Sequence, residues 1–428
     1  MAITGRTALV AALAALLAPL GAVWLLTVIG LLAAGVAVDV ALAGRIADLR
    51  MDRSGGTSTR LGQPVEVALL VTNGGRRRVR GPLRDAWLPS AGAAPRIQQI
   101  DVPPGERRRL VTTLVPTRRG DRTAAHVTVR SFGPLGLAGR QRRHQVPWSV
   151  RVLPPFTSRK FLPEKLARLR ELDGAVTLNR RGQGTEFDSL REYVDGDDVR
   201  SIDWRATARR GDVVVRTWRP ERDRRLVCVL DTGRTSAARV GDMPRLDAAM
   251  DACLLLAAVA ARAGDRVDLL AADSVVRASV EAASRNEVLP TLVQAMAPLE
   301  PALVESDAHL IAAEVLRRER KRALVVLFTS LDAEPIEQGL LPVLGGLTSR
   351  HTVVLAAVGD PRVAELARRR GDTAAVYDAA AAEQALAERR RVMGLLRRRG
   401  VLLVDAPADT FASSVADEYL ALKAAGRL

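Results

Sequence analysis

The strongest pattern in the sequence is a continuous apolar stretch from Ala8 to Ala43, which contains one acidic residue, Asp39. A helix rises about 1.5 Å per residue, so this stretch is too long for one helix perpendicular to a hydrocarbon core of about 30 Å. Pro19 and Gly21 interrupt it near the middle. Two short helices fit this pattern better, and residues 1–50 are therefore expected to form a transmembrane hairpin anchor.

Arginine residues stand on both sides of this stretch: Arg6 precedes it, and Arg45, Arg50 and Arg53 follow it. Under the positive-inside rule, both ends of the hairpin lie in the cytoplasm. The expected location is the cell membrane, with the soluble domains in the cytoplasm. Two alternatives stay open. A single long tilted helix would export everything that follows. A cleaved signal peptide would leave no anchor, although its apolar region usually has only about 7 to 15 residues.

Over residues 55–155 the pattern changes to short alternating or β-branched runs, such as PVEVALLVTNGG from Pro64 and QVPWSVRVLP from Gln145. Turn residues, including Pro103, Pro104 and Gly105, separate these runs. Several short strands at this spacing are typical of an antiparallel sandwich. We expect residues 55–155 to form an immunoglobulin-like β-sandwich.

From residue 225 to 428, apolar strands alternate with helices. The expected strands are LVCVLD, DRVDLLAA, ALVVLFTS, TVVLAAV and VLLVDA, and the expected helices span Leu246–Ala263, Asn286–Met296, Ala308–Arg320, Glu383–Arg399 and Thr410–Ala425. Strands that are apolar throughout and are separated by helices predict a parallel sheet covered on both faces. The expected fold of residues 225–428 is a doubly wound α/β domain, with its ligand site at the carboxyl ends of the strands.

Residues 156–224 connect these two domains and are expected to pack on the α/β domain. A short helix is predicted over Glu164–Leu172. In DGDDVRSIDWRATARRG, Asp197 or Asp198 is expected to cap a helix that Gly211 ends, and DVVVRTW follows as a strand. We interpret this stretch as a structural joint, in which Tyr193 and Trp204 are buried and Asp203 pairs with an arginine.

Composition excludes several functional classes. The formal charge of +16 comes almost entirely from arginine, and attraction to an anionic membrane surface explains it better than specific nucleic-acid binding. Cys228 and Cys253 lie in apolar runs without a CxxC spacing, and the four histidines are scattered, which argues against a zinc enzyme. Neither GxGxxG nor GxxxxGK[ST] occurs, so neither familiar nucleotide-binding loop is predicted.

A specific motif lies between Gly184 and Val215. It contains Glu-Phe, Arg-Glu-Tyr, Gly-Asp-Asp and Arg-x-Ile-Asp-Trp. These elements resemble the pattern of the bacterial "domain of unknown function 58" family, in which an Ala-x-x-x-Gly follows. The residues that carry the resemblance are Glu186, Phe187, Arg191, Glu192, Tyr193, Gly196, Asp197, Asp198, Arg200, Ile202, Asp203, Trp204, Ala206 and Ala208. The order of the predicted domains extends the resemblance over nearly the whole chain.

The resemblance implies a von Willebrand factor A-like domain over residues 225–428 and an association with MoxR-type AAA+ ATPases. Such domains hold a metal ion in an adhesion site, whose oxygen ligands suit Mg²⁺. The matching positions are Asp231, Thr235, Ser306 and Ser330. Gly233 stands where the pattern has a serine, and Ser330 stands where it has an aspartate, unless Asp332 substitutes. The metal site is therefore expected to be degenerate, with no certain cofactor and at most weak Mg²⁺ binding.

The favoured hypothesis is a non-enzymatic, membrane-anchored adaptor that binds a client protein and works with a MoxR-type ATPase in protein assembly or remodelling. One alternative is a metal-assisted hydrolase in which Asp231 acts together with the acidic residues of DGDDVRSID. The other is nucleic-acid binding through the Arg-rich segment Arg205–Arg225, which lacks the interleaved aromatic residues of a recognition module.

Overall fold

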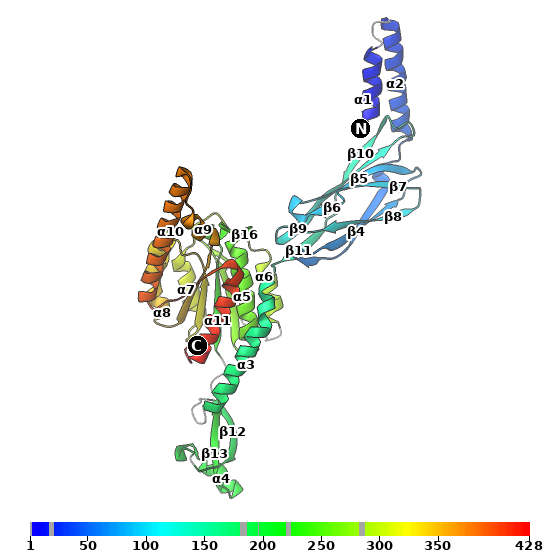
Figure 1. Ribbon diagram of the computed structural model, residues 1–428. Helices are drawn as coiled ribbons and strands as arrows, with labels where there is room; N and C mark the ends of the chain where they lie inside the picture. Colours follow the sequence, from blue (N-terminus) through cyan, green and yellow to red (C-terminus); the bar gives the residue numbers. More distant parts are fainter. Residues whose placement is uncertain (1, 17–20, 180–185, 196, 220–223, 282–286) are drawn as a thin grey trace. The chain divides into compact units, whose positions relative to one another are not determined.

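The chain folds into two compact units, Met1–Leu153 and Pro154–Leu428. The computed structural model describes residues 2–16, 21–179, 186–195, 197–219, 224–281 and 287–428 (Figure 1). The first unit carries an apolar N-terminal helix and two β-sheets, and the second contains an α/β sheet. The predicted multidomain organisation is thereby confirmed at this level.

The N-terminal segment contains a two-residue strand, β1 (Ala2–Ile3), and two helices, α1 (Gly5–Leu16) and α2 (Ala22–Leu42). The two helices lie side by side (Figure 1). Within the described residues, α2 is the helix that is long and apolar enough to cross a membrane, whereas α1 has only 12 residues. Residues 17–20, which include Pro19 of the predicted break, lie outside the described part of the chain.

The first unit also contains two β-sheets. One contains β1, β3 (Ser58–Arg60), β5 (Val79–Trp87), β7 (Ile97–Val102), β9 (Gly120–Phe132), β10 (Ala138–His144) and β11 (Ser149–Leu153). The other contains β2 (Leu49–Gly55), β4 (Val65–Asn73), β6 (Ala93–Ala94) and β8 (Arg107–Leu114). Most neighbouring strands are antiparallel, whereas β3 and β11 run parallel. Buried side chains from both sheets, including Leu69, Leu83 and Val129, form one hydrophobic core.

A buried ion pair joins the two sheets. Arg53 of β2 donates to both carboxylate oxygens of Asp85 of β5, at 3.0 and 2.6 Å, and both side chains are almost completely buried. The indole N–H of Trp87 donates to the same carboxylate at 2.9 Å. The sequence pattern did not predict this ion pair, because polar positions in alternating strands are normally expected to face the solvent.

The α/β sheet of the second unit has the order β18–β17–β14–β19–β20–β21. Its strands are β14 (Arg225–Asp231), β17 (Arg266–Ala272), β18 (Val276–Val280), β19 (Leu324–Phe328), β20 (Thr352–Gly359) and β21 (Leu402–Pro407). The expectation of an entirely parallel sheet is wrong at one edge, because β18 runs antiparallel to β17. A three-residue connection separates these two strands, which is too short for the crossover that a parallel pair needs.

Helices cover both faces of this sheet. The helices α5 (Arg245–Arg262), α6 (Val288–Met296) and α11 (Ala408–Ala424) lie together on one side (Figure 1). Buried residues of α7 (Ala308–Arg318), α8 (Leu341–Thr348) and α10 (Thr373–Arg398) form a core with the strands on the other side. Because the central strands are buried on both faces, their sequences are apolar throughout.

Three helices in the C-terminal half of the α/β domain differ from the sequence prediction. The helix α10 begins ten residues before Glu383, because Asp372 caps it by accepting a hydrogen bond from the backbone N–H of Ala375 at 2.8 Å. Two further helices, α8 and α9 (Pro361–Arg368), were not predicted. An aspartate followed by a proline does stand at the start of α9, which is a known helix-start signal.

The second unit begins with a short η4 turn (Thr157–Phe161) and α3 (Leu162–Asn179), which is longer than the predicted Glu164–Leu172 helix. The side chain of Thr157 donates to Asp251 of α5 at 2.7 Å. Lys165 of α3 is buried, and its Nζ lies 2.9 Å from both carboxylate oxygens of Asp417 of α11. These polar contacts attach α3 to the helices of the α/β domain.

The signature motif folds as a hairpin of β12 (Glu186–Glu192) and β13 (Val214–Arg219), with a short η5 turn (Val199–Ser201) and α4 (Trp204–Arg210) between the strands. We call residues 186–219 the signature segment. The single helix predicted here is wrong. Ile202 is extended and forms a β-bridge with Val215, so the helical path is interrupted, and Asp203 rather than Asp197 or Asp198 caps α4. Gly211 ends α4 in a left-handed conformation, as predicted.

The prediction that Trp204 is buried in a joint is also wrong. Trp204 is the first residue of α4 and is 66% exposed. Tyr193 is only partly buried. The predicted pairing of Asp203 is confirmed: its carboxylate lies 2.8 Å from the guanidinium of Arg216.

Candidate binding site at the sheet switch point

The candidate site lies where the chain reverses the direction in which strands are added to the α/β sheet. The neighbouring strands β14 and β19 are the first and fourth of this sheet in chain order. The chain therefore continues from β14 toward one edge of the sheet and from β19 toward the other edge. At such a point the two connecting loops diverge and leave a crevice at the carboxyl ends of the two strands. Asp231 is the last residue of β14, and Thr329 directly follows β19. The topology thus brings these two side chains together.

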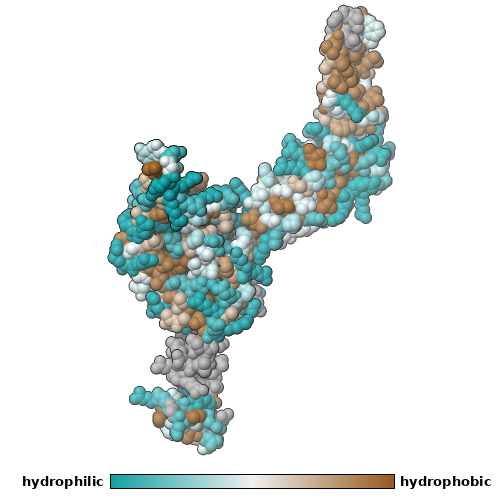
Figure 2. Space-filling view, viewed as in Figure 1, coloured by the Kyte–Doolittle hydropathy of each residue, from teal (hydrophilic) through white to brown (hydrophobic). Residues whose placement is uncertain are grey.

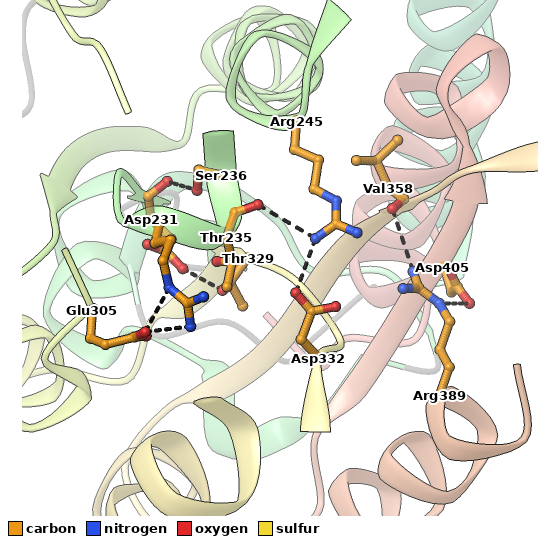
Figure 3. A network of polar contacts seen from close by, with 11 residues as sticks. Asp231, Thr235, Ser236, Arg245, Glu305, Thr329, Asp332, Val358, Arg389 and Asp405 are labelled. Atoms are coloured by element: carbon orange, nitrogen blue, oxygen red, sulfur yellow. Dashed lines mark hydrogen bonds and ion pairs between the residues drawn. The ribbon is translucent and has the colours of Figure 1, made fainter. Parts of the chain in front are cut away.

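The Asp231 carboxylate is the centre of this site (Figure 3). It is 8% exposed, and each of its oxygens accepts a hydrogen bond from a hydroxyl group. Oδ1 lies 2.5 Å from Oγ of Ser306, and Oδ2 lies 2.6 Å from Oγ1 of Thr329. The backbone N–H of Gly233 also donates to Oδ1, at 2.9 Å. Both oxygens of the buried carboxylate are therefore satisfied within the protein.

Gly233 shows why Ser306 approaches so closely. A Cβ atom placed on Gly233 would collide with Oγ of Ser306 and would also lie 3.0 Å from the backbone oxygen of Val304. The space that a serine side chain would need at position 233 is thus already occupied by the hydroxyl of Ser306. The glycine in DTGRTS is the reason that the 302–307 loop can close over Asp231.

A second buried aspartate holds this loop in place. Asp273, which follows β17, accepts hydrogen bonds from Thr232 at 2.9 Å and from Arg277 at 2.7 Å. Burial favours the protonated form, but the hydrogen bonds from Arg277 and Thr232 outweigh it and lower the pKa of Asp273 below its usual value. Its backbone oxygen accepts from the N–H of Asp307 at 3.1 Å, so Asp273 fixes the loop at the start of α7.

A cationic pocket adjoins Asp231. Arg245, the first residue of α5, places its Nη1 3.1 Å from the Asp332 carboxylate and 3.4 Å from the backbone oxygen of Thr235 (Figure 3). Thr235 and Ser330 line the same pocket, together with Phe328 and Phe411. Among the described residues, the buried hydroxyl of Ser330 has no hydrogen-bond partner. This pocket therefore offers a guanidinium and a hydroxyl next to Asp231.

The structure separates the predicted metal ligands into two groups. Ser306 binds the Asp231 carboxylate, whereas Thr235 and Ser330 line the pocket beside Arg245. Sequence analysis did not select Thr329, which supplies the second hydroxyl, or Arg245. Asp332 was considered as a metal ligand, but its carboxylate faces a guanidinium.

This donor set fits Mg²⁺ poorly. It contains one carboxylate, whose oxygens both accept hydroxyl hydrogen bonds, and Arg245 brings a positive charge to the neighbouring pocket. Over the described residues, no group of three or more His, Cys, Asp or Glu side chains is placed to hold a metal ion. A hard cation that gives up its water reluctantly needs more negative charge than this.

We therefore expect calorimetric titration of the full-length protein with Mg²⁺ to show no binding tighter than about millimolar. The matched control is Asp231→Asn, which should give the same titration curve because the parent carboxylate does not hold the ion. Micromolar affinity that disappears in Asp231→Asn would contradict this reading of the site.

Three aspartates of the signature segment are engaged in local contacts. Asp197 pairs with Arg191 at 2.5 Å, Asp198 accepts from the backbone N–H of Arg200 at 3.0 Å, and Asp203 caps α4. Hydrogen bonds from the N–H of Ala206 and from Arg216 lower the pKa of Asp203. Glu192 is exposed. The side chains of Glu186 and Phe187, and all of Gly196, lie outside the described part of the structure.

Comparison with known proteins identifies the family of this region. Residues 189–397 match the family described as "Protein of unknown function DUF58". This part of the chain, which contains most of the signature segment and the Asp231 site, belongs to the DUF58 family, as the sequence motif predicted.

The relatives do not add a function. "Uncharacterized protein Rv1480" of Mycobacterium tuberculosis (strain ATCC 25618 / H37Rv) and "Uncharacterized protein Mb1516" of Mycobacterium bovis are each 30% identical to the chain over 188 residues. The match covers 43% of this chain and 58% of each relative.

Similarity to solved structures is weak. The CARDB domain of the PF1109 protein from Pyrococcus furiosus matches 24% of this chain and 92% of its own length, with 18% identity and a TM-score of 0.19. A β-glucosidase from Listeria innocua matches 23% of this chain and 16% of its own length, with 11% identity and a TM-score of 0.16. Scores this low indicate neither a shared overall fold nor a shared function.

Proposed function

We propose that this protein is a membrane-anchored, non-enzymatic adaptor that binds other proteins and works with a MoxR-type AAA+ ATPase in protein assembly or remodelling. The observation that carries this proposal is the state of Asp231. It stands at the position where this type of sheet binds ligands, yet its carboxylate is held by two hydroxyls and a backbone N–H. A carboxylate fixed in this way is suited to shaping a binding surface rather than to binding a metal ion.

The order of the strands supports a von Willebrand factor A-like assignment for residues 225–428. Such an assignment fits a sheet whose first strand ends in aspartate, whose third strand is the antiparallel edge, and whose fourth strand lies beside the first. In this interpretation Asp231, Thr235 and Ser306 correspond to an adhesion site. Arg245 contributes a fixed positive charge beside them, so a partner's acidic side chain needs no metal ion in order to bind.

The N-terminal contacts support a hairpin anchor. Ala2 and Ile3 of β1 pair with Gly139 and Ala138 of β10, so the chain before α1 and the chain after α2 both belong to the first unit. A cleaved signal peptide would remove a strand from this sheet. Together with the flanking arginines, these contacts favour two helices that enter and leave the membrane on its cytoplasmic side.

This topology makes a direct prediction. A reporter fused after Leu428 should be active when it requires the cytoplasm and inactive when it requires export. The matched control is a reporter fused after Leu16, which lacks α2 and everything that follows it. If α1 alone directs the chain outward, this reporter should be active when it requires export and inactive when it requires the cytoplasm. Export-dependent activity of the full-length fusion would contradict the hairpin.

The signature segment supplies a surface for the ATPase. This segment carries four exposed apolar residues: Val194, Val199, Trp204 and Val213. The backbones of Tyr193, Ile202 and Asp203 contact Val213–Val215 and hold these parts of the segment together. Exposed arginines at positions 200, 205 and 209 accompany the apolar residues. Trp and Arg are the residues that most often dominate protein interfaces, and the arginines favour an acidic partner surface.

We expect Trp204→Ala to weaken binding of the MoxR-type ATPase by about 2 kcal/mol, while the free energy of unfolding changes by less than about 0.5 kcal/mol. The control is Tyr377→Ala, which removes another exposed aromatic ring, on α10, and should leave binding unchanged. Binding is measured by surface plasmon resonance with the full-length protein in detergent. A destabilised Trp204→Ala variant with normal binding would contradict the assignment.

The proposal as a whole is tested by affinity purification of the full-length protein from crosslinked native membranes. Recovery of a MoxR-type ATPase with the parent protein, and its loss with Trp204→Ala, is the expected result. Recovery of nucleic acid in place of an ATPase would instead favour the Arg-rich segment as the functional surface.

A further inference from the structure

The turn between β9 and β10 lies against the apolar helix α2. This turn, residues 131–139 with the sequence SFGPLGLAG, has no charged side chain. Leu135 at its tip is 52% exposed. A Cβ atom placed on Gly35 of α2 would lie 2.9 Å from the Leu137 side chain and 3.8 Å from that of Leu135. The two leucines therefore reach about two helical turns back from the end of α2 at Leu42.

Hydrogen bonds fix the turn at this height. The Asp39 carboxylate of α2 accepts from the backbone N–H groups of Leu135, Leu137 and Ala138, at 2.8, 2.5 and 3.0 Å. It is fully buried, and Gly133 makes the approach possible because any Cβ there would collide with Asp39. The turn thus satisfies the hydrogen-bonding capacity of the one acidic residue in the apolar stretch, which allows it to lie next to a low-dielectric region.

The first helix is attached to the same turn. The hydroxyl of Thr4 donates to the backbone oxygens of Gly136 and Leu137, at 2.7 and 3.0 Å, and the hydroxyl of Thr7 also donates to the Leu137 oxygen. The start of α1, the end of α2 and the turn therefore form one rigid junction. The turn cannot move away from the helices without breaking these contacts.

The length of α2 determines where this junction would lie relative to the hydrocarbon core of a membrane. From Ala22 to Asp39 the helix rises only about 25 Å, which is less than a hydrocarbon core of about 30 Å. If α2 crosses the membrane, Asp39 and the turn beside it must lie at the hydrocarbon boundary. Figure 2 shows hydrophobic side chains along α1 and α2. Exposed ones include Leu9, Leu13, Trp24, Leu26 and Leu31.

Positive charge surrounds the turn where lipid head groups would lie. Arg130 and Arg140 flank it in sequence, and a Cβ atom on Gly136 would lie 3.0 Å from the guanidinium of Arg6. The Nε of Arg140 donates to the backbone oxygen of Val40 at 3.0 Å, at the end of α2. Apolar side chains between arginines match the boundary between acyl chains and anionic head groups.

We propose that the β9–β10 turn is a third membrane-embedded element, which inserts Leu135 and Leu137 at the boundary between acyl chains and head groups of an anionic lipid bilayer. This inference rests on the proposed membrane anchor. The turn adds apolar contact with lipid and, through the Asp39 junction, fixes the first unit against the membrane surface.

The test places a fluorescent nitrobenzoxadiazole probe on single cysteines of the full-length protein, reconstituted in vesicles of phosphatidylcholine and phosphatidylglycerol. Leu135→Cys reports on the turn. Leu31→Cys, on the exposed face of α2, reports on the anchor itself. Val115→Cys follows the end of β8 that lies away from the junction, and is the aqueous control. The parent protein, with Cys228 and Cys253 buried, is the labelling blank.

Nitroxide-labelled phosphatidylcholine should quench the probes at positions 31 and 135 but not at 115. At position 135 a nitroxide near the head group should quench more strongly than one near the chain end. Quenching at 31 with a position 135 signal equal to that at 115 would overturn the inference and leave the anchor intact. Lack of quenching at both 31 and 135 would overturn the anchor, and the inference with it.

Discussion

Replacing Asp231 with alanine should lower the free energy of unfolding of the second unit by about 3 kcal/mol. The change removes the acceptor of three hydrogen bonds and leaves the Ser306 and Thr329 hydroxyls and the Gly233 N–H without it. Each buried donor left unsatisfied costs about 1 to 3 kcal/mol, and partial relaxation of the 302–307 loop reduces the sum. The measurement is chemical denaturation of the full-length protein in detergent, followed by circular dichroism.

Two variants make this result specific. Asp231→Asn keeps one acceptor oxygen and should lose about half as much stability. Asp242→Ala removes an exposed aspartate of the same unit and should change stability by less than about 0.5 kcal/mol. The presence of excess Mg²⁺ should not alter any of these values. Stability of the parent protein that rises with Mg²⁺ and is lost in Asp231→Ala would show that the carboxylate holds a metal ion.

Replacing Asp39 with alanine should destabilise the first unit by about 4 kcal/mol. This carboxylate accepts from three backbone N–H groups of the β9–β10 turn, and hydrogen bonds to a charged group each contribute about 1.5 to 3 kcal/mol. The turn would then detach from α2, and the freed amides would face an apolar surface. Limited proteolysis of the reconstituted protein should show new cleavage between Ser131 and Gly139.

The control for this variant is Asp52→Ala, which removes an exposed aspartate of β2 in the same unit and should leave the cleavage pattern unchanged. If Asp39→Ala instead increases stability, the charge is costly at this position and the hydrogen bonds do not compensate for it. Such a result would contradict the role assigned to Asp39 in the junction.

Much of the fold follows from hydrophobic periodicity. Five of the six strands of the α/β sheet are rich in apolar residues, so these five were recognised from the sequence, and α5, α7 and α11 were placed to within a few residues. Elements with little contrast between their faces were missed. The alanine-rich start of α10 lacks a periodic pattern, and the edge strand β18 has largely exposed residues.

The candidate site was predicted only in part. Asp231 was identified because aspartate at the end of a first strand occupies a known ligand position, and Ser306 because of the family resemblance. Thr329 and Arg245 come from β19 and α5, and only the fold brings them to Asp231. The exposure of Trp204 was not predicted, because an aromatic residue in a motif of mixed charges suggests packing. A residue that contacts a partner protein has the same sequence signature.

The most direct test of the adaptor proposal is photo-crosslinking from the rim of the Asp231 site in native membranes. Arg234 is exposed, follows Asp231 by three residues and pairs only with the exposed Glu305 of the 302–307 loop among the ion pairs of the described residues, so a benzoylphenylalanine at this position would replace no buried contact. The adaptor account predicts crosslinks to a protein, either a client or a MoxR-type ATPase, with equal yield before and after treatment with EDTA. A second variant carries benzoylphenylalanine in place of the exposed Trp204. Crosslinking from position 234 that requires a divalent metal ion, or the absence of any protein crosslink from both positions, would contradict the account.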